Sequence, residues 1–221
     1  AAAVLESPSA HPLEKLAAVL AEHEEWCSDS GRPEAAMEAR FVLIEALHGA
    51  FSQDDDRSLV RSRLAEFLSR GRTRPWWAVG QAILAEFTRQ EDASDAGVRA
   101  RRLALEGAER FPGSPGGRRC LHIARSIEAP GLSAEMMAAD GPGRRSIRLT
   151  HRNVGSVFFR AYPLDLEALV RGAKDYNIFP RWDEAEKIIR DRAPASAWRA
   201  VLPPTPDYRD HKTYVEIPAG L

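Results

Sequence analysis

The sequence predicts an α+β protein, in which an N-terminal array of helices precedes part of an antiparallel β-sandwich. Two observations predict this class. Up to about residue 129, apolar side chains recur at helical spacing in segments separated by short polar breaks. Residues 146–162 then alternate polar and apolar side chains, as strands do. We therefore expect an α-helical repeat-like domain over residues 1–129 and a β-domain over residues 130–221.

Six helices are predicted in the first domain, and each carries apolar residues three or four positions apart. They cover about residues 12–28, 34–50, 54–71, 75–87, 94–111 and 118–127. Pro12 suits a first helical turn, with Ser9 or His11 near the N-cap, and Ser94 is expected to cap the fifth helix. The Pro- and Gly-rich residues 111–117 predict a turn before the sixth helix.

Short connections between the predicted helices are typical of antiparallel neighbours. This layout suggests stacked helix pairs, a short solenoid of the tetratricopeptide type. The fifth helix supplies the supporting detail, because Ala100, Ala104 and Ala108 are evenly spaced and a Phe-Pro pair follows them. A small irregular helical bundle is the alternative, and the sequence leaves it open.

Five extended segments are predicted in the second domain, at about residues 132–138, 145–152, 157–164, 197–202 and 213–218. In the second of them Ile147, Leu149 and His151 share one side, so His151 is expected to pack or hydrogen-bond across strands. Turns are expected at residues 141–143 and, as a hairpin-like break, at residues 153–155.

The second domain contains too few predicted strands for a complete sandwich. Between its third and fourth strands, residues 165–192 are interpreted as a helical or looped insertion. We expect the sandwich to be partial, so that it either continues in a longer protein or leaves an edge unpaired.

Composition and charge limit the classes of function. Of the 221 residues 44% are hydrophobic, which is enough for a core, and 31 basic and 32 acidic residues leave a formal net charge of −1. This balance argues against nucleic acid as a main partner. No apolar run approaches the roughly 20 residues of a membrane span. The chain starts with alanine, which fits either a removed leader or the edge of a fragment.

The sequence contains no residue pattern of a catalytic, cofactor-binding or metal site. Its histidines and cysteines lack the spacing of metal ligands, and Cys120 and His122 would diverge on a helix. The acidic residues 54–56 favour the positive N-terminus of a helix rather than a bound cation. We therefore expect no catalytic residue, no cofactor and no metal, and we predict that the chain is not an enzyme.

Two pairs of residues leave alternatives open. Cys27 and Cys120 either pair in an oxidising compartment or remain buried thiols. Trp76 and Trp77 are adjacent, so their side chains diverge by about 100° on a helix. One of them should pack in the core, while the other is exposed, contacts a neighbouring helix or lines a ligand groove.

Three stretches resemble the N-terminal portion of bacterial α2-macroglobulin-like proteins. The first, residues 108–132, is similar to a Phe/Tyr-Pro-x-Ser turn, a Cys-containing helix and an Ile-Glu-x-Pro exit. The second, residues 151–162, is similar to a Tyr-Arg-Asn-Val strand pair, with His151 where tyrosine is common.

The third stretch begins at Trp198. It continues with an Asp-Tyr-x-x-His run at residues 207–211 and an Ile-Pro-x-Gly-Leu segment at residues 217–221, which resembles the family's Ile/Leu-Pro-x-Leu. Together the three stretches extend the resemblance over about residues 95–221. The order and spacing of the motifs carry the resemblance, rather than any one of them.

The resemblance implies a non-catalytic scaffold within a bacterial endopeptidase inhibitor. Such inhibitors are secreted or periplasmic and are often membrane-anchored, here through a segment that would precede residue 1. Such proteins trap proteases after cleavage of a bait segment, so the implied partners are proteases and further macroglobulin-like domains of the same chain. Many members form a thioester from a Cys-x-x-Gln motif, which neither Cys27 nor Cys120 belongs to. The bait and thioester regions would lie beyond Leu221. The alternative is a stand-alone helical-repeat adaptor that binds a protein or peptide partner.

Overall fold

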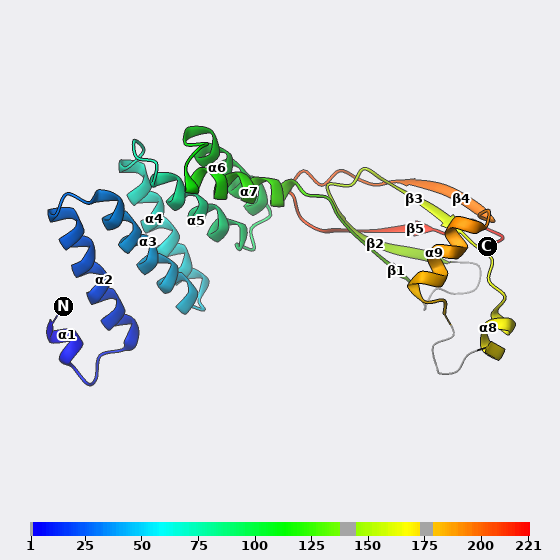
Figure 1. The fold of residues 1–221 in the computed structure, drawn as a ribbon, viewed down its shortest axis with the longest axis horizontal. Helices are drawn as coiled ribbons and strands as arrows, with labels where there is room; N and C mark the ends of the chain where they lie inside the picture. The colour runs from blue at the N-terminus through cyan, green and yellow to red at the C-terminus, as the bar shows by residue number, and fades with distance from the viewer. Residues whose placement is uncertain (1, 138–144, 173–178) are drawn as a thin grey trace. The chain divides into compact units, whose positions relative to one another are not determined.

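The protein is a mixed α+β chain made of two compact units, Ala1–Ala129 and Pro130–Leu221 (Figure 1). The computed structural model describes residues 2–137, 145–172 and 179–221. Within these residues, the first unit contains only helices and turns, and the second contains all the strands. Each unit has its own apolar core.

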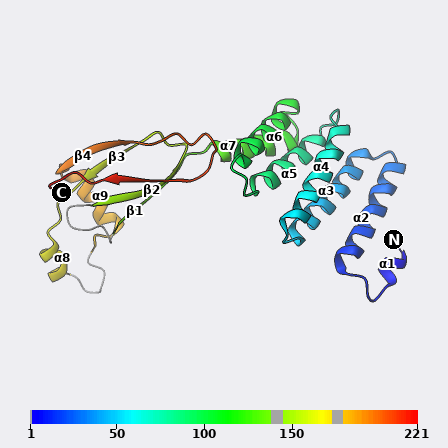
Figure 2. The same cartoon turned by 180° about the vertical axis from the view of Figure 1, so that it is seen from behind.

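Consecutive helices of the first unit lie side by side along its length (Figure 2). Their bounds are α1 Ala2–Glu6, α2 Pro12–Asp29, α3 Pro33–Ala50, α4 Asp54–Arg70, α5 Trp77–Arg89, α6 Ala96–Arg110 and α7 Pro115–Glu128. Six of them confirm helices that periodicity predicts, and the short α1 was not predicted. Helix α5 also contacts α7, so the helices do not pack only against the helices next to them in the sequence. Whether the helices form tetratricopeptide-like repeats stays a prediction.

The start of α2 follows from its local sequence. The His11 ring accepts a hydrogen bond from the Leu13 N–H at 3.2 Å, and the Glu14 carboxylate accepts one from the His11 N–H at 3.0 Å. Pro12 occupies the first helical turn, where no N–H is needed. This reciprocal capping box confirms His11, rather than Ser9, as the N-cap.

Three predicted helix starts were wrong. Helix α5 begins at Trp77, with Trp76 as its N-cap, rather than at Pro75. The N-cap of α6 is Asp95, not Ser94, and it makes no capping bond through its side chain. Helix α7 begins at Pro115 rather than near Arg118, because the Ser114 hydroxyl accepts a hydrogen bond from the Gly117 N–H at 2.9 Å. Two of the three glycines of the predicted turn, Gly116 and Gly117, are therefore helical, and the connection between α6 and α7 spans only residues 111–114.

The core of the helical unit is centred on α5. The Trp77 ring is fully buried, and its indole N–H donates to the Leu68 carbonyl at 2.9 Å. Phe41 and Leu64 pack into the same cluster from α3 and α4. Small residues of α6 such as Ala100 and Ala104 are also wholly buried. Small side chains allow helices to approach closely, so α5, α6 and α7 form a tightly packed group.

The second unit contains two antiparallel sheets. Its elements are β1 Gly131–Met136, β2 Ser146–Arg152, β3 Ser156–Ala161, α8 Leu166–Gly172, α9 Trp182–Asp191, β4 Ser196–Val201 and β5 His211–Glu216. One sheet has the order β1-β2-β5, and the other pairs β3 with β4. In the register, Leu149 lies opposite Thr213 and Phe159 lies opposite Trp198. The predicted insertion at residues 165–192 contains α8 and α9, whose described side chains are not buried.

Residues from both sheets share one small core. Ile147 and Leu149 of β2 are buried beside Leu202, and Phe159 and Trp198 stack with their ring centroids 4.9 Å apart. Residues of both sheets therefore contribute to one core. Whether the two sheets form a sandwich, partial or complete, stays a prediction.

His151 occupies the position expected from the alternation of β2. It is fully buried, and its Nε2 atom lies 3.0 Å from the hydroxyl of Thr213 on β5. The predicted role in cross-strand packing and hydrogen bonding is confirmed.

The expected hairpin at residues 153–155 was wrong, because β2 and β3 belong to different sheets. Asn153 has a left-handed backbone, with φ of 55°, and its N–H donates to the buried Thr205 hydroxyl at 2.8 Å. The Leu202 N–H donates to the Gly155 carbonyl at 2.9 Å. The segment is thus a crossover between sheets. The turn expected at residues 141–143 lies outside the described residues.

Among the described residues, every helix is too short or too polar to cross a lipid bilayer.

Candidate functional site

The two cysteines are free, buried thiols in the helical unit, as one of the two alternatives predicted. Cys120 is wholly buried on α7, and its thiol donates to the Ala78 carbonyl at 3.3 Å. Burial raises the pKa of the Cys120 thiol to about 12, with a small further rise from Glu86 and an opposing effect of Arg119. Since the thiolate is the nucleophile, this cysteine is unsuited to covalent chemistry at neutral pH.

The other candidate ligands stay apart. His122 is exposed on α7, while Cys120 points into the core. Asp54, Asp55 and Asp56 are exposed in the first turn of α4, where their charge suits the helix dipole. Within the part of the chain that the structure describes, no group of three or more histidine, cysteine or acidic side chains could hold a metal ion.

The tryptophan pair divides as the sequence predicts. Trp77 is buried in the core, whereas Trp76 is half-buried and its indole N–H donates to the Glu38 carboxylate of α3 at 2.8 Å. That hydrogen bond ties the start of α5 to α3. The ring of Trp76 is thereby held at the surface of the helical unit.

Trp76 lines an open groove with a volume of about 470 Å³. The groove is built from Trp76 and Pro75 before α5 and from the α6–α7 connection. The complete lining is Glu34, Pro75, Trp76, Arg110, Phe111, Pro112, Gly113, Ser114 and Pro115. We call it the Trp76 groove. Two features that the sequence singles out separately, the tryptophan pair and the Pro- and Gly-rich turn, meet at this site.

The shape of the Trp76 groove is set by close packing beneath it. A Cβ atom on Gly116 would lie 2.3 Å from the Val79 nitrogen, and one on Gly117 would lie 1.9 Å from the Phe111 carbonyl oxygen. Only glycine allows the start of α7 to rest on α5 in this way. Phe111 meets the Trp77 ring edge-on, with centroids 6.3 Å apart. One wall of the groove therefore rests on the core of the unit.

Two arginines lie at the Trp76 groove, Arg110 in its lining and Arg118 bonded to the lining residue Gly113. Arg110 holds its guanidinium 5.7 Å from the Trp77 ring centroid and donates from Nε to the Arg72 carbonyl at 2.7 Å. Arg118 donates to the carbonyl of Gly113 at 2.7 Å. Both heads are therefore fixed by carbonyl oxygens rather than by carboxylates, and their positive charge is not neutralised by these contacts.

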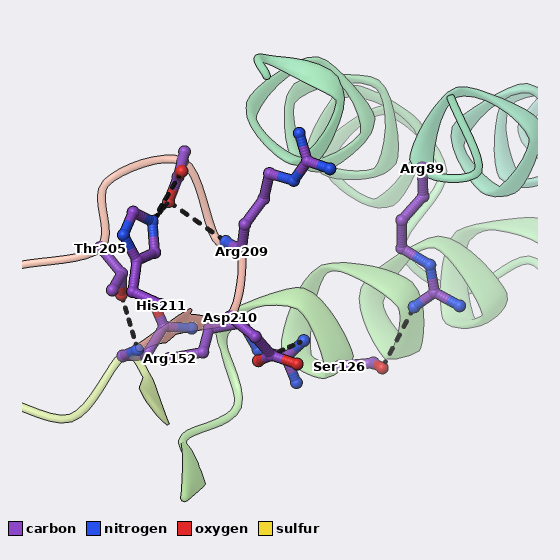
Figure 3. A network of polar contacts seen from close by, with 9 residues as sticks. Arg89, Ser126, Arg152, Thr205, Arg209, Asp210 and His211 are labelled. Atoms are coloured by element: carbon purple, nitrogen blue, oxygen red, sulfur yellow. Dashed lines mark hydrogen bonds and ion pairs between the residues drawn. The ribbon is translucent and has the colours of Figure 1, made fainter. Parts of the chain in front are cut away.

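A second polar cluster lies in the β unit, on the loop between β4 and β5 (Figure 3). The His211 ring lies 2.8 Å from the Asp207 carboxylate, which also accepts a hydrogen bond from the Arg209 N–H at 3.2 Å. Burial opposes ionisation of Asp207, but its bonds with His211 and Arg209 outweigh that effect and lower its pKa. Arg152 of β2 approaches Asp210 at 3.7 Å.

The contacts of Asp207, Arg209, Asp210 and His211 stabilise the conformation of the loop between β4 and β5. Asp207 and His211 are four residues apart and close the loop onto itself, and Tyr208 between them takes a left-handed backbone, with φ of 57°. Thr205 attaches the start of the loop to Asn153. Figure 3 also draws a separate contact within the helical unit, where Arg89 donates to the Ser126 hydroxyl at 3.4 Å.

Reasoning from the sequence missed part of each site. The Asp-x-x-x-His spacing at residues 207–211 was noticed as a motif, but the bond between its ends was not predicted. For the groove, the sequence offers only two separate signals, the tryptophan pair after Pro75 and the Pro- and Gly-rich residues 111–117. Comparison of the chain with models of protein families, with curated proteins and with solved structures finds no match.

Proposed function

We propose that this chain is a non-catalytic scaffold and interaction region of a bacterial α2-macroglobulin-like endopeptidase inhibitor. Support comes from the three stretches that resemble this family, at residues 108–132, 151–162 and 198–221. In the structure, these stretches include three parts with structural roles. They are the α6–α7 connection, the buried residue His151 and the loop between β4 and β5.

One observation carries the proposal, the bond between Asp207 and His211. These residues are the first and last of the Asp-Tyr-x-x-His run, and their side chains meet at 2.8 Å. The spacing of the run therefore has a physical reason, since it closes a loop that is also bonded to β2. Because the matching residues determine the conformation of this loop, the resemblance favours a similar fold rather than a chance similarity in composition.

The β unit is proposed as a module in a series of sandwiches. In the described residues, β1 and β5 are the outer strands of one sheet, and the second sheet consists only of β3 and β4. Outer strands carry backbone N–H and C=O groups on one side that can pair with another strand. A neighbouring β-module is proposed to cover them, and movement between modules is proposed to close the trap.

The experiment first determines the complete reading frame that contains the codon for Leu221. The full-length protein that this frame encodes is then expressed. It is incubated with an endopeptidase, and residual cleavage is measured on a large protein and on a short chromogenic peptide. A trap shields the enzyme sterically, so we expect cleavage of the protein to fall while cleavage of the peptide persists. Equal cleavage of the large protein with and without the inhibitor, across serine, cysteine and metalloproteases, would reject the proposal.

A stand-alone helical adaptor is the second candidate, and the Trp76 groove favours it. An aromatic groove on a helical unit suits peptide binding whether or not a trap is present. A reading frame that continues through further β-modules supports the inhibitor. A stop codon directly after the codon for Leu221 supports the adaptor instead.

A further inference from the structure

We propose that the Trp76 groove is a docking site for an extended, acidic, proline-containing segment of a partner protein. The inference rests on the proposed role of the helical unit as an interaction scaffold, and it adds the chemistry of the partner. It is argued from the apolar lining of the groove, from the charge around it and from the rigidity of its walls.

The lining favours an extended segment with proline. The groove presents the Trp76 ring together with Phe111 and three prolines, Pro75, Pro112 and Pro115. Aromatic-lined grooves bind proline-rich segments because these segments are already extended and lose little conformational freedom on binding. The indole N–H of Trp76 is engaged by Glu38, so the ring offers mainly apolar surface to the occupant.

The charge around the groove favours an acidic occupant. Arg110 belongs to the lining, Arg118 donates to the lining residue Gly113, and Arg74 directly precedes Pro75 in the chain. Among the described residues, none of these three arginines has a carboxylate within ion-pair distance. Glu34 is the acidic member of the lining and the Glu38 carboxylate contacts the Trp76 indole, so three arginines stand against two carboxylates. A partner with aspartate and glutamate beside its proline would complement this excess of positive charge.

The walls of the groove are already ordered. The α6–α7 connection is held by the Ser114 cap and by the close contact of Gly116 with α5. Arg110 and Arg118 are bonded to backbone carbonyls, which restricts their side chains before any partner arrives. A preformed site of this kind loses less entropy on binding than a mobile one.

The test uses the 221-residue chain and three fluorescein-labelled decapeptide pools. Each peptide has a central Pro-x-x-Pro motif. In the first pool the flanking residues are aspartate and glutamate, and in the second pool they are asparagine and glutamine. In the third pool the flanking residues are lysine. Binding is followed by fluorescence anisotropy. We expect the acidic pool to bind, and its affinity to fall roughly tenfold when salt rises from about 0.05 to about 0.5 M, since salt screens exposed charges.

Three variants locate the site. The double variant Arg74→Gln/Arg118→Gln should weaken binding of the acidic pool by roughly tenfold, as two exposed charge contacts are lost. Arg102→Gln/Arg125→Gln has the same net charge but changes exposed arginines of α6 and α7 outside the groove, and it should bind within about twofold of the wild type. Trp76→Ala should reduce affinity by more than about tenfold. Circular dichroism and urea unfolding show that each variant is folded.

Three results would overturn the inference: equal binding of the acidic and neutral pools, equal weakening by the two arginine variants, or no binding by any pool. Equal binding of the acidic and neutral pools that is lost in Trp76→Ala would keep the groove as a peptide site but reject its acidic specificity. The protease-shielding assay is read independently, so failure here is distinguishable from failure of the proposed function.

Discussion

Gly116 of α7 lies against the backbone of Val79 on α5, so closely that an added Cβ would come within 2.3 Å of the Val79 nitrogen. The neighbouring atoms are main-chain atoms of a buried helix, which cannot rotate away as a side chain can. This contact joins α7 to the centre of the helical unit. It also places the α6–α7 connection where it forms one wall of the Trp76 groove.

Replacement of Gly116 by alanine should therefore destabilise the helical unit. We expect a loss of about 3 kcal/mol in the free energy of unfolding, because the methyl group forces α7 away from α5. Urea unfolding followed by circular dichroism measures the change. Gly113→Ala is the matched control, since a Cβ there meets no atom within 4 Å, and it should stay within about 0.5 kcal/mol of the wild type. Similar losses in both variants would contradict the contact.

Cys120 should make the helical unit lose stability in alkali. Burial raises its pKa to about 12 from 9.0, so above about pH 9 the unfolded chain releases the thiol proton while the folded chain keeps it. The stabilisation is complete below the unfolded pKa and is lost as pH rises toward 12. Between pH 8 and pH 10 the wild type should lose about 1 kcal/mol more than Cys120→Ala. Parallel profiles from urea titrations would show that the thiol is accessible.

His48 should make stability fall in mild acid. The ring is buried and stacks on Phe87 with centroids 3.6 Å apart, and burial, with help from Arg57 and Arg61, lowers its pKa below 6.5. Below pH 6.5 the unfolded chain therefore takes up a proton that the folded chain resists, and stability declines until the folded pKa is reached.

The measurement compares urea midpoints at pH 7.5 and pH 5.5 in the wild type and in His48→Phe. The variant keeps an aromatic ring against Phe87 but cannot titrate. We expect a larger decrease in the wild type than in the variant. A decrease of the same size in both proteins would mean that other groups cause the acid sensitivity.

In the β unit, Phe159 and Phe158 should respond in opposite ways to aspartate. Phe159 faces the shared core and stacks on Trp198, while Phe158 is 74% exposed. Phe159→Asp removes that packing and places a charge against the core, so it should destabilise the unit by on the order of 3 kcal/mol. Phe158→Asp should change stability by less than about 0.5 kcal/mol. Thermal unfolding monitored through tryptophan fluorescence separates the two, and a reversed order would contradict the strand register.

Much of the helical unit could be predicted because the information is local. The start of α2 depends on His11, Pro12 and Glu14, which lie within four residues of one another. The buried side of β2 follows in the same way from the alternation of Ile147, Leu149 and His151. Periodicity and capping need no knowledge of the rest of the chain.

The start of α7 shows where such reasoning stops. Gly116 and Gly117 are a turn signal by composition, yet they lie in a helix that is capped by Ser114 and packs closely on α5 through Gly116. The same holds for residues 153–155, whose turn-forming residues connect two sheets instead of two paired strands. In both segments the turn and the observed conformation are compatible with the local sequence. Tertiary packing therefore determines which of the two forms.

The Trp76 groove could not be predicted from the sequence, because its lining residues come from segments that are far apart in the chain. The tryptophan pair alone predicts that one ring is buried and the other lies near the surface, because adjacent helical positions point in different directions. That Trp76 meets Phe111 and its prolines in one groove is a property of the tertiary structure, since these segments lie more than 30 residues apart in the chain. Local stereochemistry determines which side of a helix or strand is apolar, and the packing of α5, α6 and α7 determines which of those surfaces come together.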